Sequence, residues 1–402
     1  MTLEEKKAKE LYDERALNFV RTCNHIEPDY VPILGSVLTW PVGYYHMDLR
    51  EMLTRPEELA EGFCRIFDEV RFDVSHICGI STSIRTLEAL GSDTFFISPD
   101  GTTIQHEERC FMKPSDYDEL IKDPEKFMVD ELGKRKLPRL EKGDEDSYAT
   151  LVAAAKEQMV FGRINSSIGK IMTQRYGIVP VYGKSKVYPP FDYIFDRLRG
   201  FAGTMTDVRR NRAKLLEATN VMYEYVKGWV GGAVNQIGTG GVVEGGGIME
   251  GFPYAVSTLH CPTFMRPNDF AELYFPTFKL LVEAVYNNGS KTVLFNEGSW
   301  AKFNDIMKEL PKGATVSMLD EDDPIEYKKD MGEWTTVCGG VHVATLKSES
   351  KEYCIDEAKR LLDSCAPGGG FVFSTDKSLC SGNDVNIDVF RAVNEFVHEY
   401  RG

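Results

Sequence analysis

The sequence lacks the features that mark several familiar classes of protein. No segment approaches the roughly 18 consecutive apolar residues that are needed to span a bilayer. The charged segment 1–16 has no apolar core of the kind found in signal peptides. Positive charge is scarce, because 62 Asp and Glu residues outnumber 47 Lys and Arg residues and give a net charge of −15. This acidic balance argues against nucleic acid or an anionic membrane as a partner.

Motifs of nucleotide binding and serine catalysis are also missing. The glycine-rich stretch 231–251 contains neither GxxxxGK[ST] nor a GxGxxG between a strand and a helix. A mobile loop over a binding site is the better interpretation, since glycine gives the backbone hinge freedom. No G-x-S-x-G elbow supplies a serine nucleophile. The nine cysteines are scattered without any CxxC pair, which predicts reduced thiols in a cytoplasmic protein.

Short apolar runs rich in β-forming residues recur along the chain and indicate the fold class. Each is followed by a helical stretch, and eight of them occur, at residues 30–36, 74–80, 178–183, 254–260, 291–297, 314–320, 335–342 and 370–375. Apolar strands that alternate with helices are typical of a parallel sheet covered on both faces. Eight such units predict a (β/α)8 TIM-type barrel with its active site at the carboxyl ends of the strands.

We expect residues 1–402 to form a single barrel domain with an amino-terminal extension and an insertion at about residues 81–165 in the first half. Residues 92–112 alternate in polarity and turn at Pro99-Asp100-Gly101, which predicts a β-hairpin. Helices are expected in the second half, each with a capping or breaking residue. Their ranges are 267–288, 299–310 with Ser299 as N-cap, 350–364, and 383–400 with Asn383 or Asp384 as cap.

Three side chains at the ends of successive predicted strands suggest a metal site. Glu297, Glu321 and His342 would converge at one edge of the barrel and could hold a divalent metal with one position open, as catalytic zinc sites do. Asp320 and Asp376 could orient these ligands, and Asp376 could itself be the third ligand. The alternative for Glu321 is a solvated loop, because it belongs to the acidic run 320–323.

Aromatic and histidine residues near the same edge are candidates for binding substrate. Tyr44, Tyr45 and His46 follow the first strand and suit a flat apolar ligand, unless they only pack the loop. His260 precedes Cys261 at the end of the fourth strand, and adjacent residues on a strand point in opposite directions, so at most one faces the site. His260 then contacts substrate or is a core histidine. Phe295 is a further substrate candidate; of Phe295 and Trp300, which flank Glu297, we expect at least one in the core.

The second half of the chain resembles the uroporphyrinogen decarboxylase-like family. The motifs that carry the resemblance are FAELYFPTFKLLVEAVYNNG, VLFNEG before a helix, VSMLDEDD, VCGGVHVATL, and PGGGFVFSTDKSL followed by NDVNIDVFRAVNEFV. The resemblance covers roughly residues 190–402 and extends more faintly to residues 30–130. It implies a (β/α)8 barrel, in agreement with the eight predicted strands.

The resemblance implies one of two chemistries: decarboxylation without a metal, or methyl transfer to or from a corrinoid, usually with zinc. The arginine-rich signature of the decarboxylases has no counterpart around Trp40-Pro41. The thiol-methylating relatives carry His-x-Cys-Gly where this chain has Phe295-Asn296-Glu297-Gly298, and their later cysteine ligand aligns near Asp376. Carboxylate and imidazole ligands make a harder Lewis acid than thiolates, and such a metal suits an oxygen of the methyl donor.

The chain is therefore most similar to the ether-cleaving methyltransferases of anaerobic O-demethylase systems, for which a Glu/Glu/His zinc set fits. This resemblance implies an enzyme with one zinc per chain, held by Glu297, Glu321 and His342. It would move the methyl group of a methoxylated aromatic to the Co(I) of a corrinoid that a separate partner protein carries. Family members often pair as dimers, which leaves a homodimer as one option.

Two alternatives stay open. The methyl donor could instead be methanol, an amine or a thioether. The chain could also be a decarboxylase-like, metal-free lyase or a non-catalytic binding barrel, in which Glu297 and Glu321 are solvated carboxylates and His342 is a core residue.

Overall fold

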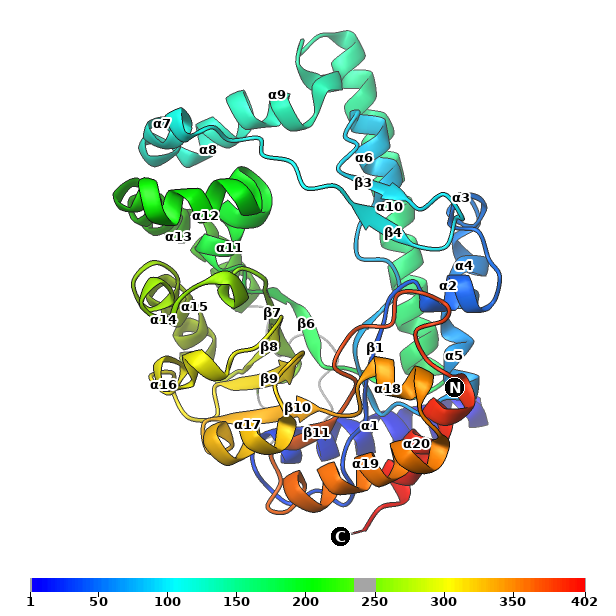
Figure 1. Ribbon diagram of the computed structural model, residues 1–402. Helices are drawn as coiled ribbons and strands as arrows, with labels where there is room; N and C mark the ends of the chain where they lie inside the picture. The colour runs from blue at the N-terminus through cyan, green and yellow to red at the C-terminus, as the bar shows by residue number, and fades with distance from the viewer. Residues whose placement is uncertain (1, 235–250, 402) are drawn as a thin grey trace.

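The computed structural model describes residues 2–234 and 251–401 (Figure 1). Residues 231–234 of the glycine-rich stretch belong to helix α13 (Arg212–Val234). Residues 235–250 lie outside the described ranges, so a mobile loop there stays a prediction.

Parallel strands curl around the centre of the molecule (Figure 1). A six-stranded parallel sheet has the order β11-β10-β9-β8-β7-β6, and a three-stranded parallel sheet has the order β1-β2-β5, among the described residues. Isolated bridges from Ile33 to Phe373 and from Val37 to Leu379 join β1 to the neighbourhood of β11. The strand bounds are β1 Leu34–Val37, β2 Val74–Cys78, β5 Val179–Pro180, β6 Tyr182–Lys186, β7 Tyr254–Leu259, β8 Thr292–Asn296, β9 Thr315–Leu319, β10 Thr335–Gly339 and β11 Phe371–Phe373.

Each of the eight predicted apolar runs contains strand residues, and the mixed α/β fold with a curled parallel sheet is confirmed. The third run is divided at Val181, so that β5 pairs with β2 while β6 pairs with β7. The hydrogen-bonded ladder is therefore shared between two sheets. A closed ring of eight strands stays an expectation.

Helices pack against the outer side of the strands (Figure 1). The first, α1 (Leu3–Cys23), starts with a capping box in which Thr2 and Glu5 satisfy each other's backbone N–H groups. Apolar residues of the strands and helices form the core, in which Trp40 and Trp300 are fully buried. Trp300 is thus the core residue expected beside Glu297. Further outer helices are α15 (Phe275–Asn287), α17 (Pro324–Met331), α19 (Lys351–Cys365) and α20 (Ile387–Glu399).

The insertion in the first half forms an arch beside the strands (Figure 1). Its predicted hairpin is confirmed, because β3 (Phe95–Ile97) pairs antiparallel with β4 (Ile104–His106). The main helices of the arch are α6 (Ile84–Leu90), α7 (Tyr117–Lys122), α9 (Gly133–Lys136) and the 30-residue α10 (Glu145–Gln174). The arch returns to the sheet through α10.

Two helix predictions hold and two have wrong starting points. Helix α19 follows its predicted cap Ser350, whose hydroxyl accepts from the Tyr353 N–H, and residues 267–288 are helical with a π turn at Phe270–Tyr274. The helix expected from Ser299 is only a 3-10 turn at Ala301–Phe303 and α16 (Asn304–Met307). The reason is that Asp322 binds the Ser299 hydroxyl and the Trp300 N–H.

The last helix, α20, begins after Asn386, which caps it through the Asp388 N–H. The expected cap Asp384 instead accepts from the N–H groups of Cys380 and Ser381. The cap therefore lies two or three residues later than the sequence suggested.

Within the described ranges, no helix is both long enough and apolar enough to cross a bilayer. All nine cysteines are free thiols.

One buried carboxylate connects the amino-terminal helix to the first two strands. Asp73 accepts from the Ile33 N–H at 3.0 Å and lies 3.2 Å from Arg15 Nε and 3.1 Å from Arg71 Nη2. The side chains of Asp73 and Arg15 are almost fully buried. A buried ion pair is costly to break, because the remaining charge has neither water nor a partner.

We expect Asp73→Ala to lower the free energy of unfolding by about 3 kcal/mol, because Arg15 would be left buried without its carboxylate. Asp13→Ala is the matched control, since it removes an exposed pair with Lys9 on the same helix and should cost about 0.5 kcal/mol or less. Urea unfolding followed by circular dichroism measures both. Equal losses in the two variants would contradict the role given to Asp73.

Candidate active site

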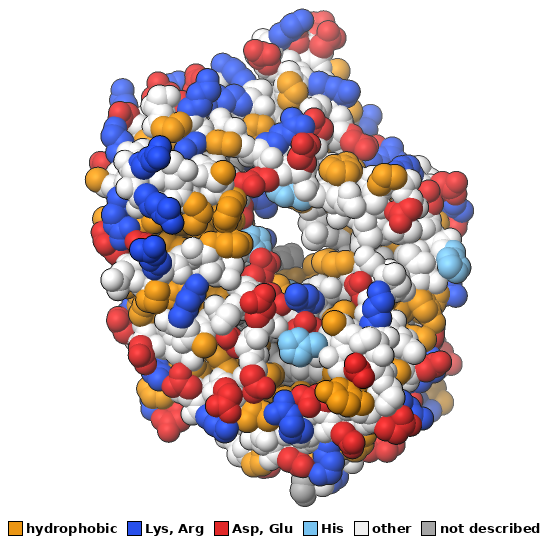
Figure 2. All heavy atoms as spheres, in the orientation of Figure 1, with side chains coloured by type: hydrophobic (Ala, Val, Ile, Leu, Met, Phe, Trp, Pro, Cys, Tyr) orange, Lys and Arg blue, Asp and Glu red, His pale blue; other side chains and the backbone are white. Residues whose placement is uncertain are grey.

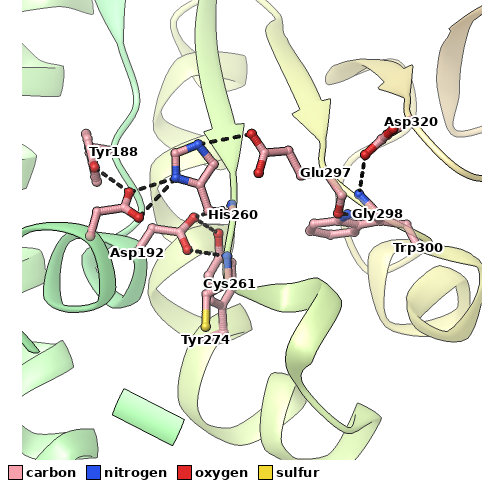
Figure 3. A network of polar contacts seen from close by, with 10 residues as sticks. Tyr188, Asp192, His260, Cys261, Tyr274, Glu297, Gly298, Trp300 and Asp320 are labelled. Atoms are coloured by element: carbon pink, nitrogen blue, oxygen red, sulfur yellow. Dashed lines mark hydrogen bonds and ion pairs between the residues drawn. The ribbon is translucent and has the colours of Figure 1, made fainter. Parts of the chain in front are cut away.

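The ends of β7 and β8 place His260 and Glu297 side by side. The two strands pair in parallel with Leu259 opposite Asn296, so the next residue of each chain segment emerges at the same edge. His260 Nε2 lies 3.2 Å from Glu297 Oε1 (Figure 3). The carboxyl ends of parallel strands are where α/β folds place their reactive groups. A histidine–carboxylate pair therefore occupies the edge at which the sequence predicts the active site.

The other nitrogen of the imidazole contacts a second carboxylate. Asp196, in the π-helical turn η4 (Ile194–Arg199), has its Oδ1 and Oδ2 3.0 and 2.9 Å from His260 Nδ1. It also accepts from the Tyr188 hydroxyl at 2.6 Å. Burial alone would lower the pKa of His260, but the hydrogen bonds and charges of Asp196 and Glu297 raise it to about 10. His260 is therefore held as an imidazolium that donates from both nitrogens.

A third carboxylate, that of Asp192, fixes the backbone at the end of β7. Asp192, one helical turn before Asp196, is fully buried and accepts from the Cys261 N–H at 2.9 Å and the Tyr274 hydroxyl at 2.6 Å (Figure 3). Burial and the neighbouring charge of Asp196 raise the pKa of Asp192. Its contacts are with the backbone and a tyrosine, so its role is to position His260.

The acidic run 320–323, which follows β9, accepts hydrogen bonds from the backbone of neighbouring loops. Asp320 accepts from the Gly298 N–H at 2.9 Å, and Asp323 caps α17 through the N–H groups of Ile325 and Glu326. Gly298 has a φ of +70°, and a Cβ there would lie 2.1 Å from the Thr263 hydroxyl, so only glycine fits this turn. With Asp322 bound to residues 299 and 300 as described above, three of the four acidic side chains hold the backbone.

His342 pairs with Asp376 at the ends of β10 and β11. His342 Nδ1 lies 3.2 Å from Asp376 Oδ2, and Asp376 Oδ1 accepts from the Val343 N–H at 2.7 Å. The hydrogen bond from Asp376 raises the pKa of His342, although partial burial opposes it. The His342 side chain is half-exposed, which disagrees with a core histidine.

The predicted metal ligands do not form one cluster in this arrangement. Glu297 lies against His260, His342 lies against Asp376, and Glu321 is exposed. Over residues 2–234 and 251–401, no group of three or more His, Cys, Asp and Glu side chains has the geometry of a metal site. These residues would fit a metal only after leaving their present partners. Zinc binding by Glu297, Glu321 and His342 stays a prediction, as does the ligand role of Asp376.

The predicted substrate residues are distributed over two places. Tyr44 stacks on Trp40 at 4.3 Å and lines, with His46, a cleft of about 870 Å³ beside the β3–β4 hairpin. Tyr45 donates to Glu69 at 2.7 Å. Phe295 lies inside the curl of strands, as described next.

A second histidine, which the sequence reasoning missed, lies inside the curl of strands. His76 of β2 stacks on Phe295 at 5.9 Å with an interplanar angle of 20°, and its Nδ1 lies 3.3 Å from the Ser36 hydroxyl. Burial, with the nearby charge of Lys186, lowers the pKa of His76 to about 4. A neutral imidazole and an aromatic ring therefore line the interior, while the charged His260 lies at its edge.

The face in Figure 2 has a deep central hollow, around which acidic and histidine side chains gather.

The sequence reasoning also missed Asp192 and Asp196, which support the site. Their spacing of four residues was the available signal, because it places two carboxylates on one face of a helix.

The paired carboxylates make the charge of His260 testable. We expect His260 to titrate well above 6.5 in the native protein, and Asp196→Asn to lower its pKa because a neutral amide replaces the charge at Nδ1. Histidine NMR titration measures this directly. Asp376→Asn is the matched control, since it should lower the pKa of His342 and leave that of His260 unchanged. A titration of His260 that Asp196→Asn does not move would contradict the arrangement.

The same shift predicts a pH dependence of stability. The folded-state pKa of His260 lies above the unfolded value of 6.5, so its contribution is fully present below that pH and is lost as the pH rises towards about 10. Urea unfolding of the native protein should show this decline, and His260→Gln should remove that part of it. An unchanged slope in His260→Gln would count against the ionised imidazole.

Comparison with known proteins gives a family match and structural matches. Residues 255–400 match the model of the uroporphyrinogen decarboxylase (URO-D) family. Among solved structures, a methyltransferase from Methanosarcina mazei superposes with a TM-score of 0.59 at 14% identity, over 95% of this chain and 97% of that one. No curated protein matches the sequence. At such identity the structural match establishes a shared fold. His260, Glu297 and His342 thus lie within the segment that matches the URO-D model, and the chain shares the fold of that methyltransferase.

Proposed function

We propose that this protein is a methyltransferase of the URO-D type that demethylates a methoxylated aromatic. The methyl group of a phenyl methyl ether would pass to the Co(I) of a corrinoid carried by a partner protein. The observation that carries the proposal is the His260–Glu297 pair at the carboxyl ends of β7 and β8, inside the URO-D match. The structural likeness to a methyltransferase over 95% of the chain supports the same class of reaction.

When an aryl methyl ether is cleaved, the departing oxygen needs a group that stabilises its negative charge, such as a proton donor. When the methyl carbon departs to the acceptor, the carbon–oxygen bond breaks and the oxygen keeps both electrons. His260 is the group at this edge that holds a proton, and its pKa of about 10 is close to that of a phenol. Because the two pKa values are close, the proton can pass from the imidazolium to the phenolate at little cost in free energy. We therefore assign to His260 the proton that the departing aryl oxygen takes up.

The residues around His260 have supporting roles. Asp196 keeps the proton on Nδ1 and orients the ring, so that Nε2 faces Glu297 and the open edge. Asp192 holds the backbone of Cys261 and so fixes the end of β7. Phe295 and His76 provide an aromatic wall inside the strands, against which the methoxy end of the donor can lie.

A zinc ion bound through Glu297, Glu321 and His342 remains part of the proposal. When bound, zinc would supply positive charge to an ether oxygen. Glu297 and His342 would have to exchange His260 and Asp376 for the ion, and Asp196 would then be the carboxylate that keeps the proton on His260. Metal content is therefore the decisive property. We also propose that the eight strands close into a barrel, with β5 and β6 counted as one strand. A cytoplasmic location, in which the nine free cysteines stay reduced, is a further part of the proposal.

A decarboxylase-like lyase that needs no metal is the second candidate, because the matched family model is that of uroporphyrinogen decarboxylase. A lyase would release carbon dioxide and would not need a corrinoid partner. A methyltransferase with methanol, an amine or a thioether as donor is a variant of the first proposal.

Metal analysis of purified protein tests the zinc proposal. We expect one zinc per chain, lost in Glu297→Ala and in His342→Ala because each removes a ligand. Glu326→Ala is the matched control, since Glu326 is exposed and pairs with Lys329 at the surface. Zinc that persists in both ligand variants, or is absent from the native protein, would overturn the assignment.

A donor screen tests the reaction. The protein is mixed with reduced corrinoid protein and methoxybenzoates, methoxybenzene, methanol, methylamines or dimethyl sulfide, and the cobalamin absorbance is followed. We expect methylation of the cobalt from the aryl ethers. Methylation from another donor alone would support the variant, whereas decarboxylation without methyl transfer would support the lyase.

A further inference from the structure

A second cavity lies directly beside the His260 site. It has a volume of about 390 Å³ and lies between the insertion and the turn η4, where Asp196 and Arg197 form part of its wall. Asp196 is the carboxylate that contacts His260 Nδ1. The cavity and the candidate active site therefore share one side chain.

Some of the basic side chains in this cavity have no carboxylate within ion-pair distance among the described residues. Lys136 from α9, Arg197 from η4 and His106 from β4 line it. Within the described ranges, neither Lys136 nor Arg197 has a carboxylate within ion-pair distance. Burial and the repulsion from Arg197 lower the pKa of Lys136 to about 8. The half-buried Lys136 and the exposed Arg197 thus lie close enough to repel each other, and Asp196 in the same wall supplies a nearby negative charge without forming an ion pair with either.

Another basic residue of this cavity does have acidic partners. Arg109, at the rim of the same cavity, has Asp93 and Glu107 within 2.7 and 3.2 Å. The protein as a whole carries a net charge of −15, so carboxylates are plentiful. Two neighbouring cations that line a cavity outside ion-pair distance of any described carboxylate favour an anion from outside.

The remaining lining suits a small aromatic anion. Phe95, Phe111 and Phe161 supply aromatic surface, and Lys136 Nζ lies 5.2 Å from the ring centre of Phe111. Hydroxyl groups also line the cavity and offer hydrogen bonds to oxygen atoms; they belong to Ser81, Thr82, Ser83, Thr86, Ser92 and Thr94. A volume of this size holds a benzoate-sized molecule.

We propose that this cavity binds the carboxylate of an aromatic acid through Lys136 and Arg197. The inference rests on the proposed function and narrows it: the methyl donor is a methoxylated aromatic acid. Its carboxylate lies between the two cations, and its ether end points past Asp196 towards His260. Lys136 and Arg197 are positioning residues that select the donor and take no part in breaking the bond.

Binding measurements without any corrinoid protein test the cavity. Calorimetry compares 3-methoxybenzoate with methoxybenzene, which lacks the carboxylate. We expect the acid to bind native protein about ten-fold or more tightly than the ether, and Lys136→Met to remove most of that difference while leaving methoxybenzene unchanged. Lys136→Arg should restore the preference. Lys134→Met is the matched control, because Lys134 is an exposed cation on the same short helix, and it should have no effect.

The outcomes separate the cavity from the reaction. Equal binding of acid and ether, or equal effects of Lys136→Met and Lys134→Met, would overturn the cavity assignment even if methyl transfer occurs. A carboxylate preference that depends on Lys136 would support the cavity even if no donor is demethylated, in which case the proposed function fails alone. Inorganic phosphate is the third probe: if it displaces 3-methoxybenzoate at lower concentration than benzoate does, the site is a phosphate site and the assignment to a carboxylate is overturned.

Discussion

The parallel pairing of β7 with β8 is the constraint on which the site depends. Because Leu259 and Asn296 are opposite each other, His260 and Glu297 follow at the same level of the same edge. Neither side chain could reach the other if the register were shifted by two residues, since each residue advances a strand by about 3.3 Å. Asp192 secures this register from the helical side by holding the Cys261 N–H. Backbone hydrogen bonds therefore set the geometry of the His260–Glu297 pair.

His260 and His76 are in opposite protonation states for simple reasons. His260 has a carboxylate at each ring nitrogen, and these charges outweigh the cost of burial. His76 is buried against Phe295 with only a serine hydroxyl near its Nδ1, so the charged form has nothing to stabilise it. The result is a charged proton donor at the edge of the curl of strands and a neutral aromatic surface inside it. This division suits a substrate with a flat ring and a polar group at the end that reacts.

The sequence predicted the elements better than their contacts. Apolar runs determine where strands form, so all eight were found, and His260, Glu297 and His342 do lie just beyond the carboxyl ends of their strands. Side-chain partners depend on neighbours that are distant in sequence. Asp196 reaches His260 from 64 residues away, and no local pattern around residue 260 contains that information. The helix expected from Ser299 starts late for the same reason, because Asp322 binds the residues that would have formed its first turn.

The central claim is that His260 gives its proton to the oxygen that leaves. The most direct measurement is the rate of methyl transfer from a series of aryl methyl ethers whose phenols differ in pKa, for the native protein and for His260→Gln. We expect His260→Gln to slow ethers of weakly acidic phenols far more than those of strongly acidic ones, because a better leaving group needs less help from a proton. The same fractional loss across the whole series would contradict it.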